Sequence, residues 1–230
     1  MQKQICVTIQ KKTIGIQGAA MKILITGFEP FNKSNINPSG EIIKKLPEEF
    51  EGITLIREIL PVEFKRASIR IKELMKLHQP DVVLSIGQAG NRPEICIERV
   101  AINLDCVRSS DGSRELPDNG GDMPVDVKIE EDGENAYFTN LPVWDLIKKV
   151  KEKDIAVAVS YSAGSFVCNH VMYTALYEVN KYYPNIRAGF VHVPFLPIQK
   201  EDNKKGYFME LEDMVTAIWE MIATIAKIKS

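Results

Sequence analysis

The chain has 230 residues, of which 45% are hydrophobic, and its formal net charge is -2 with acidic and basic residues well mixed. This length and composition suffice for one substantial core and favour a single α/β domain over two. The balanced charge provides no basic stripe for a phosphate backbone, so we expect no nucleic-acid partner.

The cysteines indicate a reduced, cytoplasmic setting. Cys6, Cys96, Cys106 and Cys168 show neither CxxC pairing nor the His and Cys spacing that is typical of zinc sites. A disulfide framework would be unusual for a chain of this size and composition. No apolar stretch is long enough to span a bilayer, so we expect no membrane association.

The first 20 residues stand apart from the rest of the chain. They do not resemble a signal peptide, because their apolar runs are short and Lys11 and Lys12 interrupt them. Met21 immediately precedes a strong predicted strand. We therefore interpret residues 1–20 as a leader before the natural start and residues 21–230 as the single domain. The alternative is an extra edge strand built on ICVTI.

Apolar runs and helical spacing alternate through the first half of the chain. In chain order they predict strand 22–28, helix 41–46, strand 53–62, helix 64–78, strand 81–87 and an alternating strand at 95–104.

The second half begins with a long polar excursion. Residues 108–136 are rich in Gly, Asp, Ser and Pro, and an excursion of this length in a compact domain is usually functional or mobile. The order resumes with helix 141–153, strand 155–159, a helix that carries Cys168, strand 188–196 and an amphipathic helix at 211–229. This alternation predicts a mostly parallel sheet with helices on both faces.

Ligands in such sheets collect beyond the carboxyl ends of the strands. Three predicted strand ends carry special residues, namely Gly27-Phe28, Gly87-Gln88 and the turn before Cys168. The fold class therefore predicts that these three places converge.

Cys168 is the candidate nucleophile. It lies near the start of a helix, after a turn through Ala163 and Gly164, where free backbone N–H groups and the helix dipole lower the pKa of a thiol. The alternative is a small buried hydrophobe, because Cys168 shares a helical stripe with apolar residues. Taken alone, the residue slightly favours packing.

A cysteine nucleophile needs a base, and the chain offers three histidines. His170 lies two residues beyond Cys168, on a different side of the helix, and His78 ends a polar helix in solvent. His192 lies within the apolar strand AGFVHVPFL and is the candidate base by elimination. The alternative is a core histidine with satisfied hydrogen bonds.

Glu98 is the candidate that orients the base. On a strand it has the same parity as Val100 and Leu104, so its carboxylate points toward an apolar face and needs a partner. A histidine N–H would serve, and the alternative is an ion pair with Arg99 or Arg108. Together the three residues predict a Cys–His–Glu hydrolase with a thioester intermediate.

Two further segments bear on the substrate. GFEPF places Phe28 and Phe31 on the loop that leaves the first strand, which suggests an apolar slot for a small flat ring or, alternatively, two caps on the core. GQAGNR, from Gly87 to Arg92, matches neither GxGxxG nor GxxxxGK[ST], so we expect no nucleotide cofactor.

These segments together resemble a known family. KILITGFEPF, INPS, GQAGNRPEICIERVAIN, PDN, YFTNLP, SAGSFVCNH and GFVHVPFLP occur in this order, and the similarity runs from Met21 almost to the C-terminus. The chain closely resembles pyroglutamyl peptidase type I. The resemblance implies a cytoplasmic cysteine exopeptidase with an α/β/α sandwich fold that removes N-terminal pyroglutamyl residues from peptides. It also implies no metal and a homotetramer or homodimer.

The resemblance also assigns residues. Its nucleophile, histidine and glutamate fall on Cys168, His192 and Glu98. Its ring pocket implies Phe28, Phe31, Phe166 and Val167, with Asn37 and Gln88 as polar partners of the lactam. Backbone N–H groups around Val167 and Cys168 are expected to form part of an oxyanion hole.

The chain departs from the family pattern in two places. Residues are inserted between Arg108 and Pro117, so the family arginine near the site corresponds to Arg108 or Arg114, and Tyr161 replaces the usual asparagine. Two rivals remain open from the sequence: a phosphate-dependent enzyme on a similar sheet, and an inactive protein that captures pyroglutamyl termini.

Overall fold

The computed structural model describes residues 20–50, 52–109, 112 and 115–228, so the leader expected at 1–20 lies outside the described part except for its last residue. A seven-stranded sheet forms the centre of this part, in the spatial order β2-β3-β1-β4-β9-β5-β8. Its strands are β1 (Met21–Phe28), β2 (Glu49–Phe50), β3 (Ile53–Leu60), β4 (Val82–Gln88), β5 (Ile95–Glu98), β8 (Val157–Ser160) and β9 (Arg187–Val193).

The sheet is mostly parallel, as predicted, but β2 at one edge and the last two strands at the other edge are reversed. Strands β3, β1, β4 and β9 run parallel, whereas β5 runs antiparallel to β9 and β8 follows β5. The strand before Cys168 therefore does not end at the same edge as β1 and β4, contrary to expectation. Because β5 and β8 have only 4 residues each, their ends still lie within roughly 10 Å of that edge.

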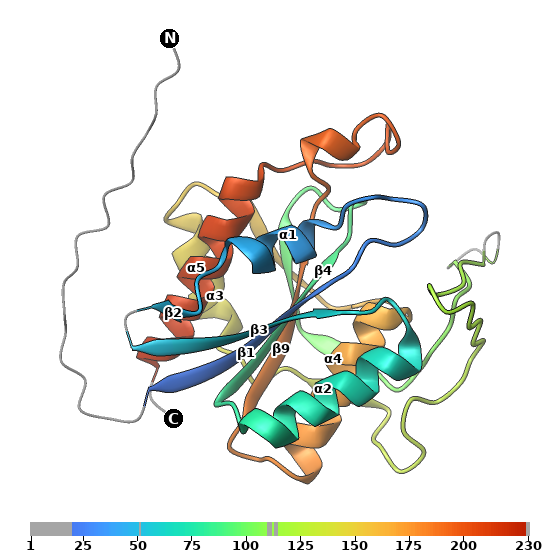
Figure 1. Ribbon diagram of the computed structural model, residues 1–230, viewed down its shortest axis with the longest axis horizontal. Helices are drawn as coiled ribbons and strands as arrows, with labels where there is room; N and C mark the ends of the chain where they lie inside the picture. Colours follow the sequence, from blue (N-terminus) through green and yellow to red (C-terminus); the bar gives the residue numbers. More distant parts are fainter. Residues whose placement is uncertain (1–19, 51, 110–111, 113–114, 229–230) are drawn as a thin grey trace.

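Helices cover both faces of the sheet (Figure 1). On one side lie α1 (Pro38–Lys45), α3 (Val143–Lys151) and α5 (Leu211–Lys227), and on the other lie α2 (Phe64–His78) and α4 (Val167–Lys181). A short 3-10 helix, η1 (Pro197–Gln199), follows β9. The predicted three-layer α/β/α sandwich is confirmed.

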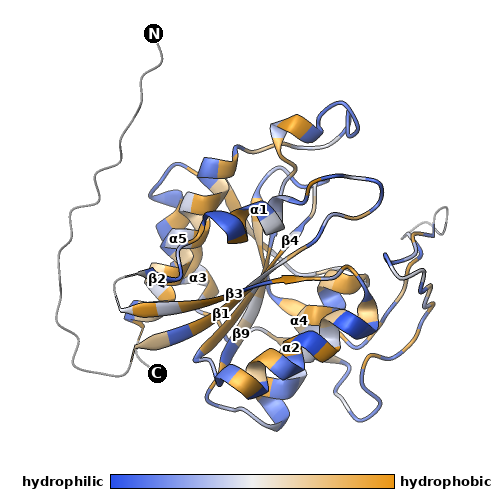
Figure 2. Cartoon of the chain, in the orientation of Figure 1, coloured by the Kyte–Doolittle hydropathy of each residue, from blue (hydrophilic) through white to orange (hydrophobic). Residues whose placement is uncertain are grey.

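Alternate residues of each strand enter the two hydrophobic cores. In β1, Ile23 and Ile25 pack under α1, α3 and α5, whereas Leu24 and Phe28 pack under α2 and α4. The strands at the centre are largely hydrophobic and the outlying loops largely hydrophilic (Figure 2). On β9, Phe190 faces the α2 and α4 side, and so does His192 two residues later. This parity aims the histidine at α4.

The single strand predicted at 95–104 is wrong. The chain breaks at Arg99 into β5, which belongs to the main sheet, and β6 (Val100–Ile102), which pairs with β7 (Ala136–Phe138) in a separate two-stranded sheet. The parity argument that joined Glu98 to Val100 and Leu104 therefore fails beyond Glu98. The face of Glu98 is instead set by β5 alone, where Ile95 and Ile97 enter the opposite core.

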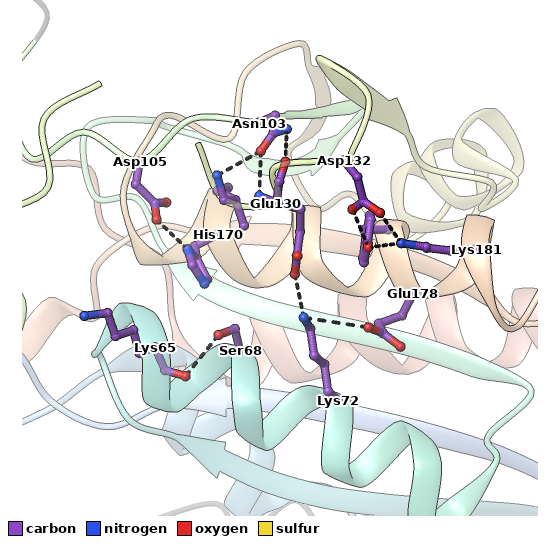
Figure 3. Close-up of polar contacts among 12 residues, drawn as sticks. Lys65, Ser68, Lys72, Asn103, Asp105, Glu130, Asp132, His170, Glu178 and Lys181 are labelled. Carbon is purple, nitrogen blue, oxygen red and sulfur yellow. Dashed lines mark hydrogen bonds and ion pairs between the residues drawn. The ribbon is translucent and has the colours of Figure 1, made fainter. Parts of the chain in front are cut away.

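The long polar excursion is anchored against α2 and α4. The Asn103 amide donates to the backbone carbonyls of Glu130 and Gly133, and its carbonyl accepts from two backbone N–H groups. Lys72 of α2 bridges Glu130 and Glu178 of α4 (Figure 3). These contacts turn a segment with little regular structure into a fixed wall beside α4.

Candidate active site

A cavity of about 240 Å³ opens where β1, β4 and the start of α4 meet. The three predicted places, Gly27-Phe28, Gly87-Gln88 and the turn before Cys168, all contribute to it or border it, so the expected convergence is confirmed. It is lined by Cys168, His192 and all the residues expected in the ring pocket, namely Phe28, Phe31, Asn37, Gln88, Phe166 and Val167.

The nucleophile candidate lies in the first turn of α4, as predicted. Phe166 is the N-cap residue, and Val167 and Cys168 are the first two helical residues. Their backbone N–H groups have no acceptor within the helix. Gly87 makes room for the thiol, because a Cβ at Gly87 would lie 2.8 Å from the Cys168 Sγ.

Gly87 also connects the thiol to the histidine. In the parallel pairing of β4 with β9, Gly87 lies opposite His192. The thiol above Gly87 and the imidazole beside it therefore border the same small cavity.

The predicted partnership of Glu98 and His192 is present in the structure. His192 donates from Nδ1 to the Glu98 Oε1 at 2.6 Å, and both side chains are almost completely buried. This bond fixes the imidazole tautomer and leaves Nε2 for chemistry in the cavity. Burial would raise the pKa of Glu98, but the hydrogen bond and charge of His192, with Ser160 and Arg92, hold it below its ordinary value.

The residue that sequence reasoning missed is Arg92. Its Nη1 donates to the Glu98 Oε1 at 2.5 Å, so the ion pair considered for Arg99 or Arg108 is made by Arg92. Arg99 instead donates to the backbone carbonyl of Thr139. The sequence signal for this role is weak, because nothing in the GQAGNR segment indicates which carboxylate its arginine contacts.

The expected lowering of the Cys168 pKa is wrong for the resting protein. Burial raises the pKa of this thiol to about 12, the negative charge of Glu98 adds to the rise, and Arg92 opposes it. The loss of water around the sulfur outweighs the effect of the helix start. At neutral pH the thiol is protonated, so its attack requires a base.

Aromatic rings form the walls of the cavity. The Phe31 and Phe166 ring centroids lie 6.3 Å apart, and Phe64 packs edge-on against Phe166 with a centroid distance of 5.2 Å. Phe28 is almost fully buried and packs against Phe190, with centroids 6.3 Å apart. Phe28 therefore both lines the cavity and caps the core, and Phe31 is more open.

Gln88 and Asn37 differ in the polar atoms they can offer a ligand. The Gln88 Oε1 accepts from the Gln199 Nε2 at 3.0 Å, an arrangement that leaves the Gln88 NH2 group as a donor. Asn37 is occupied as the cap of α1, because its Oδ1 accepts from the Ser39 N–H and hydroxyl and its Nδ2 donates to the Glu29 carbonyl. Of the two side chains, Gln88 is therefore the better candidate to hydrogen-bond a lactam.

The remaining candidates lie outside the cavity. His170 donates to Asp105 at 2.7 Å and packs edge-on against Phe64, so it holds the excursion on α4 rather than reaching Cys168 (Figure 3). Arg108 pairs with Glu115 at 2.8 Å across the inserted segment, and Arg114 is outside the described residues. Tyr161 is largely exposed.

This arrangement combines a thiol, a carboxylate-oriented imidazole and an apolar pocket, which are the groups expected of a cysteine peptidase. Residues 21–228 match the family described as Pyroglutamyl peptidase. The chain is 47% identical over 194 residues to the pyrrolidone-carboxylate peptidase of Clostridium botulinum, covering 84% of this chain and 88% of that one. It is 46% identical to the pyrrolidone-carboxylate peptidase of Thermosipho melanesiensis, covering 88% and 96%.

Solved structures agree with the sequence relatives. The crystal structure of pyroglutamyl peptidase I from Bacillus amyloliquefaciens matches with a TM-score of 0.84 at 38% identity, covering 91% of this chain and 99% of that one. Pyrrolidone carboxyl peptidase from Thermococcus litoralis matches with a TM-score of 0.82 at 34% identity, covering 90% and 93%. The chain belongs to the pyroglutamyl peptidase family, and it is a cysteine-type omega peptidase that removes N-terminal pyroglutamate from peptides.

The described residues contain no group of three or more His, Cys, Asp or Glu side chains arranged to hold a metal ion. They also contain no helix long and apolar enough to cross a membrane.

Proposed function

We propose that Cys168, His192 and Glu98 carry out the hydrolysis of pyroglutamyl peptides. The observation that supports this most strongly is the buried Glu98–His192 hydrogen bond beside a cavity that also contains the Cys168 thiol. His192 takes the thiol proton at Nε2 as the sulfur attacks the pyroglutamyl carbonyl carbon. The proton then passes to the leaving amine as the C–N bond breaks and a thioester remains.

Water completes the cycle. His192 removes a proton from a water molecule as its oxygen attacks the thioester carbonyl, and the proton returns to the departing sulfur. The backbone N–H groups of Val167 and Cys168, which have no helical acceptor, stabilise the oxyanion in both steps. The high thiol pKa makes proton transfer to His192 a necessary part of attack.

The pocket accounts for the choice of ring. Phe31 and Phe166 enclose the flat lactam and gain from its burial. The Gln88 NH2 group, oriented by Gln199, donates to the lactam carbonyl, which would otherwise be buried without a partner. A prolyl ring lacks this carbonyl and leaves the Gln88 donor unpaired.

The leaving peptide would cross into a second cavity of about 920 Å³ that shares Phe31, Gln88, Gly164 and Phe166 with the first. Arg108, which was expected near the site, lines this second cavity and would therefore contact the leaving peptide. Glu115 and Leu116 line the same cavity, so these residues would border the leaving peptide rather than the triad.

The setting and assembly follow the family. We infer a cytoplasmic protein, supported by the free thiols of Cys96, Cys106 and Cys168. A homodimer or homotetramer is expected, and light scattering coupled to gel filtration measures it.

A panel of aminomethylcoumarin amides tests the function. Turnover of the pyroglutamyl amide well above the alanyl and prolyl amides is expected. It should disappear in Cys168→Ser and persist in Cys96→Ser, a matched control at a buried free cysteine. Equal rates on the three amides would reject the substrate assignment, and full activity in Cys168→Ser would reject the nucleophile.

A further inference from the structure

The Glu98 carboxylate has a second partner besides the histidine of the proposed triad. Its Oε1 accepts from both the His192 Nδ1, at 2.6 Å, and the Arg92 Nη1, at 2.5 Å. The Glu98 side chain is fully buried, whereas about a quarter of the Arg92 side chain is exposed. A buried carboxylate needs such partners to remain ionised.

The same guanidinium reaches the segment that leads to the nucleophile. The Arg92 Nη1 also donates to the Ser160 hydroxyl at 3.0 Å, and its Nη2 donates to the Ser162 carbonyl at 2.7 Å. Ser160 ends β8 directly opposite Glu98 in the pairing of β5 with β8. From Ser162 the chain turns at Gly164, which has a φ of +82°, and enters α4.

We propose that Arg92 is a positioning residue that keeps Glu98 ionised and fixes the Ser160–Ser162 segment relative to it. This proposal rests on the proposed roles of Glu98, His192 and Cys168. Arg92 does not take part in bond making. It acts through Glu98 on the imidazole and through Ser162 on the approach to α4.

The positive charge of Arg92 helps to keep Glu98 ionised. The charge of an imidazole depends on its protonation and changes as it accepts and returns a proton, whereas a guanidinium is always charged. Burial raises the pKa of Glu98, while His192, Ser160 and Arg92 lower it, so removal of Arg92 would shift the pKa of Glu98 upward. Four titratable groups face Glu98. They are Arg92 from the loop before β5, His192 from β9, Cys168 from α4 and Cys96 from β5 itself.

The shape of the Arg92 guanidinium allows it to bind three groups together. Its planar fork contacts Glu98, Ser160 and Ser162 at once, and a lysine ammonium cannot reproduce this set of directions. Lys at this position would keep the charge near Glu98 but lose part of the hold on the Ser162 carbonyl. The two functions of Arg92 can therefore be separated by substitution.

Arg92 also lines the small cavity, so a direct contact with substrate is the competing explanation. A substrate contact predicts a higher KM with an unchanged pH profile. A purely structural role predicts a lower melting temperature with unchanged kcat and KM per folded molecule. Positioning through Glu98 predicts a changed pH profile of kcat.

The test compares Arg92→Met and Arg92→Lys with wild type, measuring kcat and KM for the pyroglutamyl coumarin amide from pH 4.5 to 9. In Arg92→Met we expect the pH at which kcat falls on acidification to rise by about one unit or more. At a pH below this fall, kcat would then be roughly tenfold lower than in wild type. In Arg92→Lys the acidic fall should stay near that of wild type while kcat drops at all pH values. Arg99→Met is the matched control, because Arg99 adjoins Glu98 in sequence but binds Thr139, and its profile should match wild type.

A second measurement does not depend on turnover. In Arg92→Met the loss of unfolding free energy on acidification should be smaller than in wild type, because a higher folded-state pKa of Glu98 lies closer to the unfolded-state pKa. A Glu98→Gln background should abolish this difference. An inactive wild type would refute the proposed function, while this stability comparison would still decide the role of Arg92. The proposal is overturned if the pH at which kcat falls on acidification is the same in Arg92→Met as in wild type and only KM or the melting temperature changes. If Arg92→Met does not fold, the proposal is overturned by an Arg92→Lys variant whose kcat equals that of wild type at every pH.

Discussion

The contact between Gly87 and Cys168 makes the substitution Gly87→Ala a sharp test of the site geometry. The added Cβ would lie 2.8 Å from the Cys168 Sγ and 2.8 Å from the Phe190 Cζ. Ordinary contacts between heavy atoms of this kind are about 3.5–4.0 Å, so the thiol or the ring must move by roughly 1 Å. The Phe190 ring is fully buried between strand and helix, which leaves the smaller thiol as the group that moves.

The expected magnitudes follow from this displacement. Overpacking of a core position costs about 1–3 kcal/mol of unfolding free energy, which corresponds to a melting temperature lower by roughly 2–12 °C for a protein of this size. A nucleophile misplaced by 1 Å can lose about a hundredfold in rate. We therefore expect kcat on the pyroglutamyl coumarin amide to fall about a hundredfold, far more than the loss of folded protein explains.

The control is Gly189→Ala on the neighbouring strand. Its Cβ would lie 2.4 Å from the Leu141 Cδ1 and 2.6 Å from the Thr139 Oγ1, away from the cavity. This variant should lose stability at least as severely while keeping its activity per folded molecule, as measured by active-site titration and thermal melting. Wild-type kcat in folded Gly87→Ala would refute the placement of the thiol above Gly87.

Two further predictions concern stability. Asn103→Ala removes four hydrogen bonds to the backbone of the excursion and should cost about 1–3 kcal/mol in urea unfolding; an unchanged midpoint would mean that the excursion is held by other contacts. Because the pKa of Glu98 is held below its ordinary value of 4.5 when folded, its contribution to stability is present above that pH and is lost as the pH falls through the folded-state pKa. Glu98→Gln should flatten this acidic loss, and an identical pH profile in the variant would contradict the assignment.

Local sequence patterns predicted most elements of the fold. The apolar runs at β1, β4 and β9 and the helical spacing of α2 and α5 each specify their element within a few residues, because burial on both faces or on one helical stripe leaves a periodic signal. The 95–104 segment failed because its alternation continues through Arg99, where the chain leaves one sheet for another. Periodicity records which face a residue occupies, not which sheet it joins.

At the site, too, some residues could be predicted from the sequence and others could not. Cys168, His192 and Glu98 could be selected because a nucleophile, a base and a buried carboxylate are distinctive residue types in their surroundings, and the family motifs carried the same three. Arg92 could not be selected, since its partners Ser160 and Ser162 lie 68 and 70 residues away in the chain. The capping of α1 by Asn37 likewise depends on a local geometry that the INPS motif did not reveal.

The amino-acid sequence by itself determined the layered α/β architecture, the family and the chemical types present at the site, because these depend on local hydrophobic period and on residue identity. Only the tertiary structure decided that β5 and β8 run against β1, β3, β4 and β9, that Arg92 shares the carboxylate with His192, and that the thiol is protonated at rest. The reason is that hydrogen bonds and loss of water depend on which distant segments meet. The Glu98–His192 bond joins residues separated by 94 positions, and no local pattern encodes such a meeting.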